Sequence, residues 1–469
     1  MITPRARALP DRHANHTSPI STNCRSLLDE FQWNPVLVVE TPKSLGVRVK
    51  IRSRASLVTA VTSSAILVMA GCSSSGGSGG GTSGQSGSSP VKIGVVVTLS
   101  GPLAQIGQSH LAGAMLAADQ LNAKGGADGH KIELVQKDEK ADPQATVTDV
   151  QQLLGNGVKL VLGGTTDSDC LGAAPLISNA GGVLIGTSCQ TNLLETTKFV
   201  PGFFEVAPTN YMLSKATAQY AHDHFPDVQS WDGIGPDYEF GHEVWSSFQT
   251  DLKALQPSVS FGKNVFVPLT ETQFGSYVSS LTSGLPSDSA TTKGLFMSLF
   301  SAPTVGLAKQ GKSQNLFGRY AAVLNLGGST PTAQALGADT PPIYFIYDYY
   351  DGAYDNPTNT AFVSAFKSAN NGDAPNAWAY EGYTAVMAYA NAIEKAKSVD
   401  PLKLRDALAG MSFDTPKGNL TFRKEDHLLM SPVTVWHAVG DASAPGGFKI
   451  TSSEAIPASE VLPPVNVGK

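Results

Sequence analysis

From residue 91 onward, apolar and polar positions follow two alternating periods. Residues 92–98 (KIGVVVT) are rich in β-branched side chains, a pattern typical of a strand buried on both faces of a parallel sheet. A turn at residues 100–102 (SGP) follows, and apolar residues then recur at helical spacing until the helix-breaking pair Gly125-Gly126. This succession of strand, turn and helix predicts a parallel α/β fold.

The same unit repeats, and the repeats fall into two series separated near Pro208. In the first series, further strands are predicted at 131–137, 158–162 and 182–185, with helices at 143–154 and 171–179. In the second, strands are predicted around Trp231 and at 264–267, 294–299 and 343–347, with helices at 211–224, 241–255, 359–369, 377–396 and 401–408. Two series of this kind indicate two Rossmann-like lobes, each built on a parallel sheet.

Ahead of the lobes, the chain carries the pattern of an export signal. Basic residues at 50, 52 and 54 precede an apolar run at 57–69, which ends in Ala70, Gly71 and Cys72. The run holds 13 residues, fewer than the ~20 that a transmembrane helix needs. We interpret 49–71 as a signal peptide. The small pair before Cys72 resembles a bacterial lipobox, in which the cysteine sulfur is acylated; the alternative is a chance cysteine after an ordinary secretory signal.

Two segments flank this signal. In the segment 72–90, the residues that follow the cysteine are nearly all Gly and Ser. A segment of this composition behaves as a flexible linker, here between an anchor and a folded domain. Residues 1–48 carry acidic side chains ahead of the basic segment, which would place the export signal inside the chain. We therefore expect translation to begin at Val47 or Val49, and residues 1–48 to be a misassigned extension.

Composition narrows the classes of function. Of 469 residues, 41% are hydrophobic and 15% are charged, as in an ordinary soluble globular protein. The net charge of -6 and the lack of a basic run interleaved with aromatics argue against a nucleic-acid partner. The four cysteines form no CxxC pair and no cluster with His at metal-ligand spacing, so we expect no metal and no cofactor. The sequence has no HExxH motif, no GxGxxG that opens a helix after a predicted strand, and a Gly-rich stretch at 76–84 that we interpret as linker and not as a phosphate cradle. We therefore expect a binding protein and not an enzyme.

Four stretches carry a family resemblance. They are 93–107 (IGVVVTLSGPLAQIG), 137–146 (KDEKADPQAT), 235–244 (GPDYEFGHEV) and 410–427 (GMSFDTPKGNLTFRKEDH). In this order they resemble the type I periplasmic-binding fold of the leucine/isoleucine/valine-binding protein family, the substrate-binding subunits of ABC importers. The resemblance implies three hinge crossings, near 207–208, 345–347 and 420–422. It places one lobe at 91–207 and 346–420, the other at 208–345 and 421–455, and a tail at 456–469.

In such lobes, ligands bind where strands end and helices begin. Two loops of the first lobe qualify, and the resemblance implies that their hydroxyls and backbone groups hold the ligand. The expected ligand-binding residues are Ser100, Thr166, Asp167, Ser168, Ser188 and Gln190 in the first lobe and Asp237, Tyr238 and Phe300 in the second. The hydroxyl groups have an alternative role as helix N-caps, and Tyr238 has one as a packed turn residue.

Three departures from the family put a branched-chain amino acid in doubt. Asp167 stands in a loop where relatives hold the ligand carboxylate, so either its side chain turns away or the solute is cationic or neutral. The stretch 319–328 has no acidic residue where relatives fix the ligand ammonium, and Ile106 replaces an aromatic residue. The expected ligand is therefore a small polar solute.

Cys170 and Cys189 follow two neighbouring strands of an exported domain, where oxidation is permitted. We expect a disulfide between them, the alternative being two buried free thiols. The sequence thus predicts an exported monomer, lipid-anchored at Cys72 to the outer face of the cell membrane, that hands a solute to an ABC permease. A ligand sensor with the same fold is the alternative function.

Overall fold

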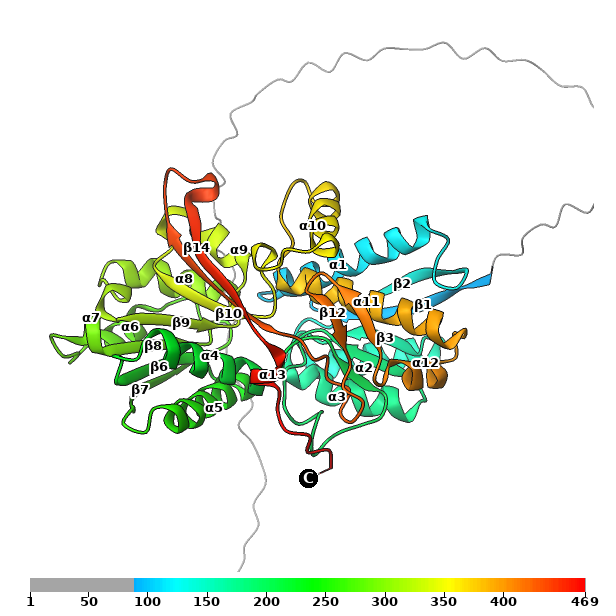
Figure 1. The fold of residues 1–469 in the computed structure, drawn as a ribbon, viewed down its shortest axis with the longest axis horizontal. Coiled ribbons are helices and arrows are strands. Elements are labelled where there is room, and N and C mark those ends of the chain that lie inside the picture. The colour runs from blue at the N-terminus through cyan, green and yellow to red at the C-terminus, as the bar shows by residue number, and fades with distance from the viewer. Residues whose placement is uncertain (1–87, 469) are drawn as a thin grey trace, which may run out of the picture. The chain divides into compact units, whose positions relative to one another are not determined.

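The computed structural model describes residues 88–468. They form a five-stranded, a seven-stranded and a two-stranded sheet, surrounded by helices (Figure 1). The expected extension at 1–48, the signal peptide, Cys72 and the linker up to residue 87 lie outside the described residues. Among the described helices, none is both long enough and apolar enough to cross a membrane.

The five-stranded sheet forms the first lobe and is parallel throughout, in the order β2-β1-β3-β4-β5. Its strands are β1 (Ser88–Val97), β2 (His130–Asp138), β3 (Leu160–Gly163), β4 (Val183–Gly186) and β5 (Phe203–Glu205). Its helices are α1 (Ala104–Ala123), α2 (Pro143–Gly155), α3 (Asp167–Asn179), α11 (Ala377–Ala396) and α12 (Pro401–Leu408). Every residue of β3 and β4 is buried, which explains their uninterrupted apolar sequence.

The seven-stranded sheet forms the second lobe, in the order β14-β13-β10-β9-β8-β6-β7. The strands are β6 (Ser230–Pro236), β7 (Ser260–Val267), β8 (Lys293–Met297), β9 (Ala322–Leu326), β10 (Ile343–Tyr347), β13 (Val433–Gly440) and β14 (Phe448–Ile456). The helices are α4 (Asn210–His224), α5 (Glu239–Leu255), α6 (Gly275–Thr282), α7 (Ser289–Thr292), α8 (Ser301–Lys312), α9 (Thr330–Leu336) and α13 (Ala458–Val461). The two-lobed α/β fold is confirmed, with one correction: the sheet is not entirely parallel, because β13 pairs antiparallel with both β10 and β14. A short connection joins β13 to β14 at the sheet edge.

The remaining elements are short or peripheral to the two large sheets. They are α10 (Pro357–Ala369), the hairpin β11 (Ser412–Thr415) and β12 (Gly418–Thr421), and the short 3-10 turns Phe317–Arg319, Gly337–Asp339, Asp351–Ala353 and Pro445–Gly447.

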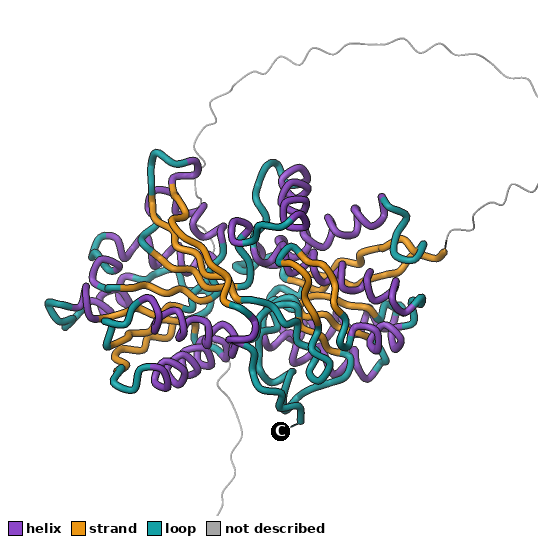
Figure 2. The backbone as a smooth tube through the Cα atoms, viewed as in Figure 1, coloured by secondary structure: helices purple, strands orange, loops and turns teal. Residues whose placement is uncertain are grey.

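The chain passes between the lobes three times through irregular segments (Figure 2). The first passage, 206–209, joins β5 to α4, and the second begins at Asp348, directly after β10. The third lies at 430–432, after the expected 420–422. The chain remains with the first lobe until then, because Phe422 pairs with Leu429 and Leu428 pairs with Glu205 of β5.

Helices α1 and α11 pack with their backbones in contact, although 271 residues separate His110 from Glu381. A Cβ added to Gly113 would lie 1.8 Å from the carbonyl oxygen of Ala379, and one added to Gly382 would lie 2.0 Å from that of His110. Only glycine permits this approach, which brings α11 side chains beside the loops that follow β3 and β4.

Candidate functional site

A cavity lies where the ends of parallel strands from both lobes face each other. The first lobe lines it with Ile106, Thr165, Thr166, Asp167, Ser188 and Gln190; the second with Tyr238, Phe240, Phe300 and Gly327; and Tyr347 of β10 and Trp378 of α11 complete it. The cavity measures about 30 Å³. That is room for a water molecule or two, so a solute can enter only if the surrounding groups separate.

Six of the expected residues line this cavity: Thr166, Asp167, Ser188, Gln190, Tyr238 and Phe300. Three do not, and each is engaged elsewhere. The Ser100 hydroxyl donates to Asp138 Oδ2 at 2.7 Å. The Ser168 hydroxyl pairs with that of Thr166 at 3.1 Å, and exposed Asp237 pairs with His242 at 2.9 Å.

Five lining residues were not expected from the sequence: Thr165, Phe240, Gly327, Tyr347 and Trp378. Thr165 and Phe240 lie within two residues of predicted ones, so the loops were identified and the inward-facing positions were not. Gly327 follows a strand, β9, that was not predicted. Trp378 reaches the site only through the packing of α11 on α1, for which the local sequence holds no signal.

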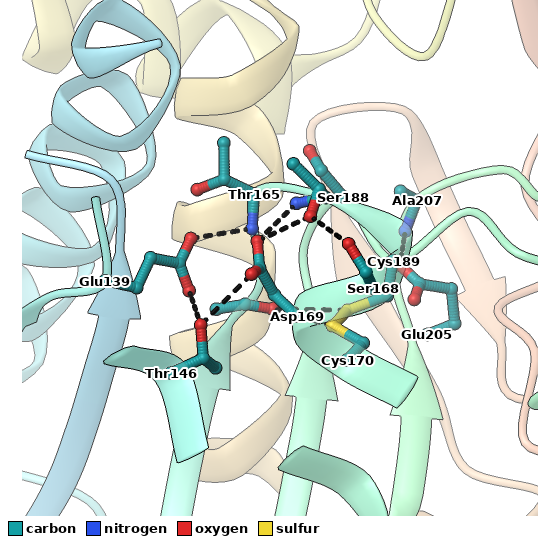
Figure 3. Close-up of a disulfide and its surroundings, with 12 residues drawn as sticks. Glu139, Thr146, Thr165, Ser168, Asp169, Cys170, Ser188, Cys189, Glu205 and Ala207 are labelled. Atoms are coloured by element: carbon teal, nitrogen blue, oxygen red, sulfur yellow. Dashed lines mark hydrogen bonds between the residues drawn. A yellow bond between two sulfur atoms is a disulfide. The ribbon is translucent and has the colours of Figure 1, made fainter. Parts of the chain in front are cut away.

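The loop between β3 and α3 is fixed by buried acids, shown in Figure 3. The Thr165 amide donates to Glu139 Oε1 at 3.0 Å, and Thr165 Oγ1 accepts from the Thr98 amide at 3.0 Å. Thr166 and Asp169 form a capping box that starts α3 at Asp167, four residues before the predicted start. Asp167, Ser168 and Cys170 therefore belong to the helix and not to a loop. Burial raises the pKa of Glu139 and of Asp169.

The predicted disulfide between Cys170 and Cys189 is confirmed (Figure 3). It joins the first turn of α3 to the segment after β4, and both cysteines are buried. The bond therefore holds together the two segments of the first lobe that supply Thr166, Asp167, Ser188 and Gln190 to the cavity.

Ser188 belongs to a buried polar cluster with His110 and Glu381. His110 Nε2 lies 2.8 Å from Glu381 Oε2, and the Ser188 hydroxyl lies 3.1 Å from both atoms. Burial lowers the pKa of His110 to about 3 and raises that of Glu381, so the pair is neutral. In a hydrolase triad the acid contacts the other ring nitrogen. Here His110 Nδ1 has no hydrogen-bond partner among the described residues, and the cluster orients Ser188 without activating it.

Asp167 is the one ionisable acid in the lining. Burial raises its pKa to about 8, a hydrogen bond from Asn210 lowers it, and the charges of Glu243 and Glu239 raise it. Asn210 Nδ2 donates to Asp167 Oδ2 at 2.9 Å and to Glu243 Oε2 at 2.7 Å, linking α3 to the second lobe. At neutral pH Asp167 is therefore mostly protonated. It faces the cavity and does not turn away.

The lining offers hydrogen-bond donors and aromatic surface but no Lys, Arg or His. Gln190 is 5% exposed, and its Nε2 has no partner within the described part of the chain. Nor do residues 88–468 bring three or more His, Cys, Asp or Glu side chains together in a way that could hold a metal ion. The lining therefore presents hydrogen-bonding groups and aromatic rings to the cavity.

Comparison with known proteins agrees with this geometry. A family model described as periplasmic binding protein matches residues 90–443. The leucine-, isoleucine-, valine-, threonine- and alanine-binding protein of Pseudomonas aeruginosa is 26% identical over 351 residues, which cover 74% of this chain and 90% of that protein.

Two solved structures show the same fold. An amino acid ABC transporter substrate-binding protein from Pseudomonas fluorescens Pf-5 superposes with a TM-score of 0.70 at 19% identity, covering 79% of this chain and 98% of that one. A solute binding protein of an ABC transporter from Rhodopseudomonas palustris BisB5, in complex with 3,4-dihydroxy benzoic acid, superposes with a TM-score of 0.69 at 19% identity, covering 78% and 96%.

Proposed function

The chain belongs to the periplasmic binding protein family, and on that premise we propose that it captures a small polar solute between its lobes for an ABC importer. The observation that carries this proposal is the cavity, whose lining comes from strand ends and helix starts of both lobes. A relative named for amino acid binding and a neighbour bound to an aromatic acid support a role in solute capture, and their different ligands leave the solute class open.

Capture proceeds by hinge closure. Because the cavity of about 30 Å³ is smaller than any organic solute, the solute enters when the lobes are apart, and contacts to both lobes then favour the closed form. The three irregular passages between the lobes are the segments that would absorb the rotation. The permease recognises the closed form.

A thermal-shift screen of the purified protein tests solute capture. Amino acids, amides, aromatic acids and organic cations are added separately, and a cleft ligand should raise the melting temperature by mass action. X-ray scattering with the stabilising compound should show a smaller radius of gyration. The proposal fails if no compound class stabilises the protein, or if a stabilising compound leaves the lobes apart.

Delivery to a permease and sensing are separated in cells. Deleting the gene should abolish uptake of the solute if the protein serves an importer. Normal uptake combined with a lost transcriptional response to the solute would instead favour the ligand sensor.

We also propose that Cys72 anchors the protein, as a monomer, to the outer face of the cell membrane. Replacing Cys72 by Ser should move the protein from the membrane fraction to the soluble exported fraction, because the acylated sulfur is removed. Persistent membrane association of Cys72→Ser would contradict the lipid anchor. A single mass corresponding to one chain in light scattering would support the monomer.

A further inference from the structure

Five of the twelve residues that line the cavity are aromatic: Tyr238, Phe240, Phe300, Tyr347 and Trp378. The rings of Tyr238 and Phe240 are 6.0 Å apart, those of Phe240 and Phe300 are 5.9 Å apart, and those of Tyr347 and Trp378 are 6.2 Å apart. The rings thus come from the second lobe, which includes Tyr347 of β10, and from α11 of the first lobe. Aromatic faces carry negative electrostatic potential, and several around one space attract an organic cation.

Carboxyl groups surround the cavity. Asp167 is in the lining, and beyond the effect of burial the charges of Glu243 and Glu239 raise its pKa, so it is mostly protonated at neutral pH in the free protein. Burial raises the pKa of Glu195 and Glu205 well above the ordinary value, and the charge of Asp167 raises it further. No basic side chain stands in the lining to hold an anionic solute. A cationic solute is favoured, because it stabilises the anion of Asp167.

A separate observation points to a ligand at the other side of the cavity. The Gln190 side chain is 5% exposed, lines the cavity, and has an Nε2 group without a partner in the described structure. A buried amide donor without an acceptor is costly. An oxygen atom of a solute would satisfy it, and the Thr166 and Ser188 hydroxyls lie in the same wall.

We propose that the captured solute carries a substituted ammonium group, held by the aromatic rings and Asp167, and an oxygen-bearing end that accepts from Gln190. This inference rests on the proposed solute capture and names its solute class. A quaternary ammonium group suits the site, because it has no N–H group to satisfy and its charge is spread over methyl surface that packs against rings.

The proposal has a consequence for pH. A bound cation favours the ionised form of Asp167, so binding lowers its pKa from about 8 and releases a proton. With a permanently charged probe, affinity should rise about tenfold between pH 7 and pH 9, as Asp167 in the free protein ionises. The other titratable groups that face or surround Asp167 are Asp169 of α3, Glu195, Glu205 of β5, and Tyr238, Glu239 and Glu243 at the start of α5.

The decisive experiment compares isosteres in the unmodified protein by titration calorimetry. The probes are the permanent cations choline and tetramethylammonium, the neutral choline isostere 3,3-dimethyl-1-butanol, the zwitterion leucine and the anion 4-hydroxybenzoate. At least one cation should bind, with roughly tenfold or greater preference for choline over the neutral isostere. Binding of that cation should strengthen from pH 7 to pH 9.

Variants test whether the cation binds at this cavity. Asp167→Asn and Trp378→Leu should each weaken cation binding roughly tenfold, whereas Asp223→Asn, an acid-to-amide change at an exposed position of α4, should leave it unchanged. The isostere comparison needs no variant, so it stands even if Trp378→Leu does not fold.

The outcomes separate this inference from the proposed function. If leucine or 4-hydroxybenzoate binds and none of the cations does, the solute class is wrong and solute capture stands. Equal binding of choline and its neutral isostere would show an apolar cavity and would also overturn the cationic class. If no probe binds, the cationic class is contradicted, and the thermal-shift screen decides separately on solute capture.

Discussion

The carboxyl group of Asp167 links the binding site to protein stability. It is 3% exposed, and its folded-state pKa of about 8 exceeds the ordinary value of 3.8 because burial disfavours the anion. Between about pH 4 and pH 8 the unfolded chain ionises this group while the folded protein keeps it protonated. Ionisation therefore favours unfolding, and the contribution of Asp167 to stability falls as pH rises through this window and is constant above it.

Asp167→Asn should remove this dependence, since an amide oxygen still accepts from Asn210 and does not titrate. Relative to the unmodified protein, the variant should gain up to about 1.4 kcal/mol of unfolding free energy for each pH unit between about 4 and 8. Urea unfolding at pH 5 and pH 7 measures the gain in unfolding free energy of the variant over the unmodified protein. The control Asp223→Asn, which changes an exposed carboxyl group, should show no such gain. If Asp167→Asn changed the unfolding free energy by the same amount at both pH values, the raised pKa of Asp167 would be contradicted.

From the sequence, the loops that border the cavity could be predicted, but the directions of individual side chains could not. Thr166, Asp167, Ser188 and Gln190 were found because strand ends and helix starts leave a clear pattern. Ser168 has the same pattern, yet the capping box turns it toward Thr166 and out of the lining. Such outcomes depend on competing hydrogen bonds, which composition and spacing do not determine.

Among the elements, the β11–β12 turn ties two of the passages between the lobes together through one buried ammonium group. Lys417 forms an ion pair with Asp348, directly after β10, and both side chains are fully buried. Lys417 Nζ also donates to Ser431 Oγ at 2.8 Å and to the carbonyl oxygen of Pro432 at 2.9 Å, in the third passage. The second and third passages are therefore held at one point.

Lys417→Met should lower the unfolding free energy by about 3–5 kcal/mol, because it leaves Asp348 buried without its partner. The double variant Lys417→Met/Asp348→Asn should recover part of the loss, since no uncompensated charge remains. Urea unfolding of the single and double variants measures both effects. A loss below about 1 kcal/mol for Lys417→Met would mean that the pair does not hold the passages.

The contact between α1 and α11 makes a second prediction at this scale. Gly382→Ala should destabilise the protein by roughly 1–3 kcal/mol or more, because the added methyl group would meet the His110 carbonyl oxygen and force the helices apart. Gly155→Ala, at the end of α2 where a Cβ meets nothing within 4 Å, is the matched control and should be neutral or mildly stabilising. Equal melting temperatures for the two variants would contradict the close approach.

A buried apolar run made several strands predictable, but burial alone did not decide the outcome: β9 is buried throughout and was missed, whereas β2 is partly exposed and was predicted. β3 and β4 are buried throughout and stood out as apolar runs. β14 is mostly exposed at the sheet edge and has no such run, and β5 has three residues. Edge strands and very short strands form because they pair with segments distant in sequence, as Glu205 pairs with Leu428. The residues of such a strand do not indicate which distant segment it will pair with.

At the scale of the whole molecule, hydrogen bonds join the two lobes, and under the proposed hinge closure these bonds would favour the closed form. Asn192, in the first lobe after β4, donates to Glu243 of α5, and its Oδ1 accepts from the Tyr211 amide of α4 at 2.9 Å. The bond from Asn210 to Asp167 makes a further link. Asn192 itself is outside the cavity lining, so it acts on closure without touching a solute.

Asn192→Ala should shift the free protein toward the open form, because bonds made between the lobes are lost and the hydrophobic cores are untouched. A bond to a charged group contributes about 1.5–3 kcal/mol, so affinity should fall roughly tenfold or more. The fold-loss of affinity should be the same for every solute that binds, whatever the charge of that solute. The uniform loss distinguishes an effect on closure from an effect on ligand recognition, because Asp167→Asn should weaken the binding of cations selectively.

Scattering and calorimetry together test the closure prediction. Without solute, Asn192→Ala should have a larger radius of gyration than the unmodified protein, and at saturating solute the two should agree. The control Asn419→Ala removes an exposed side chain that donates a hydrogen bond to Asp414 within the β11–β12 hairpin. It should change neither the radius of gyration nor the affinity. If Asn192→Ala weakened one solute and not another, its effect would be local to the cavity and the bonds at Asn192 would not control closure.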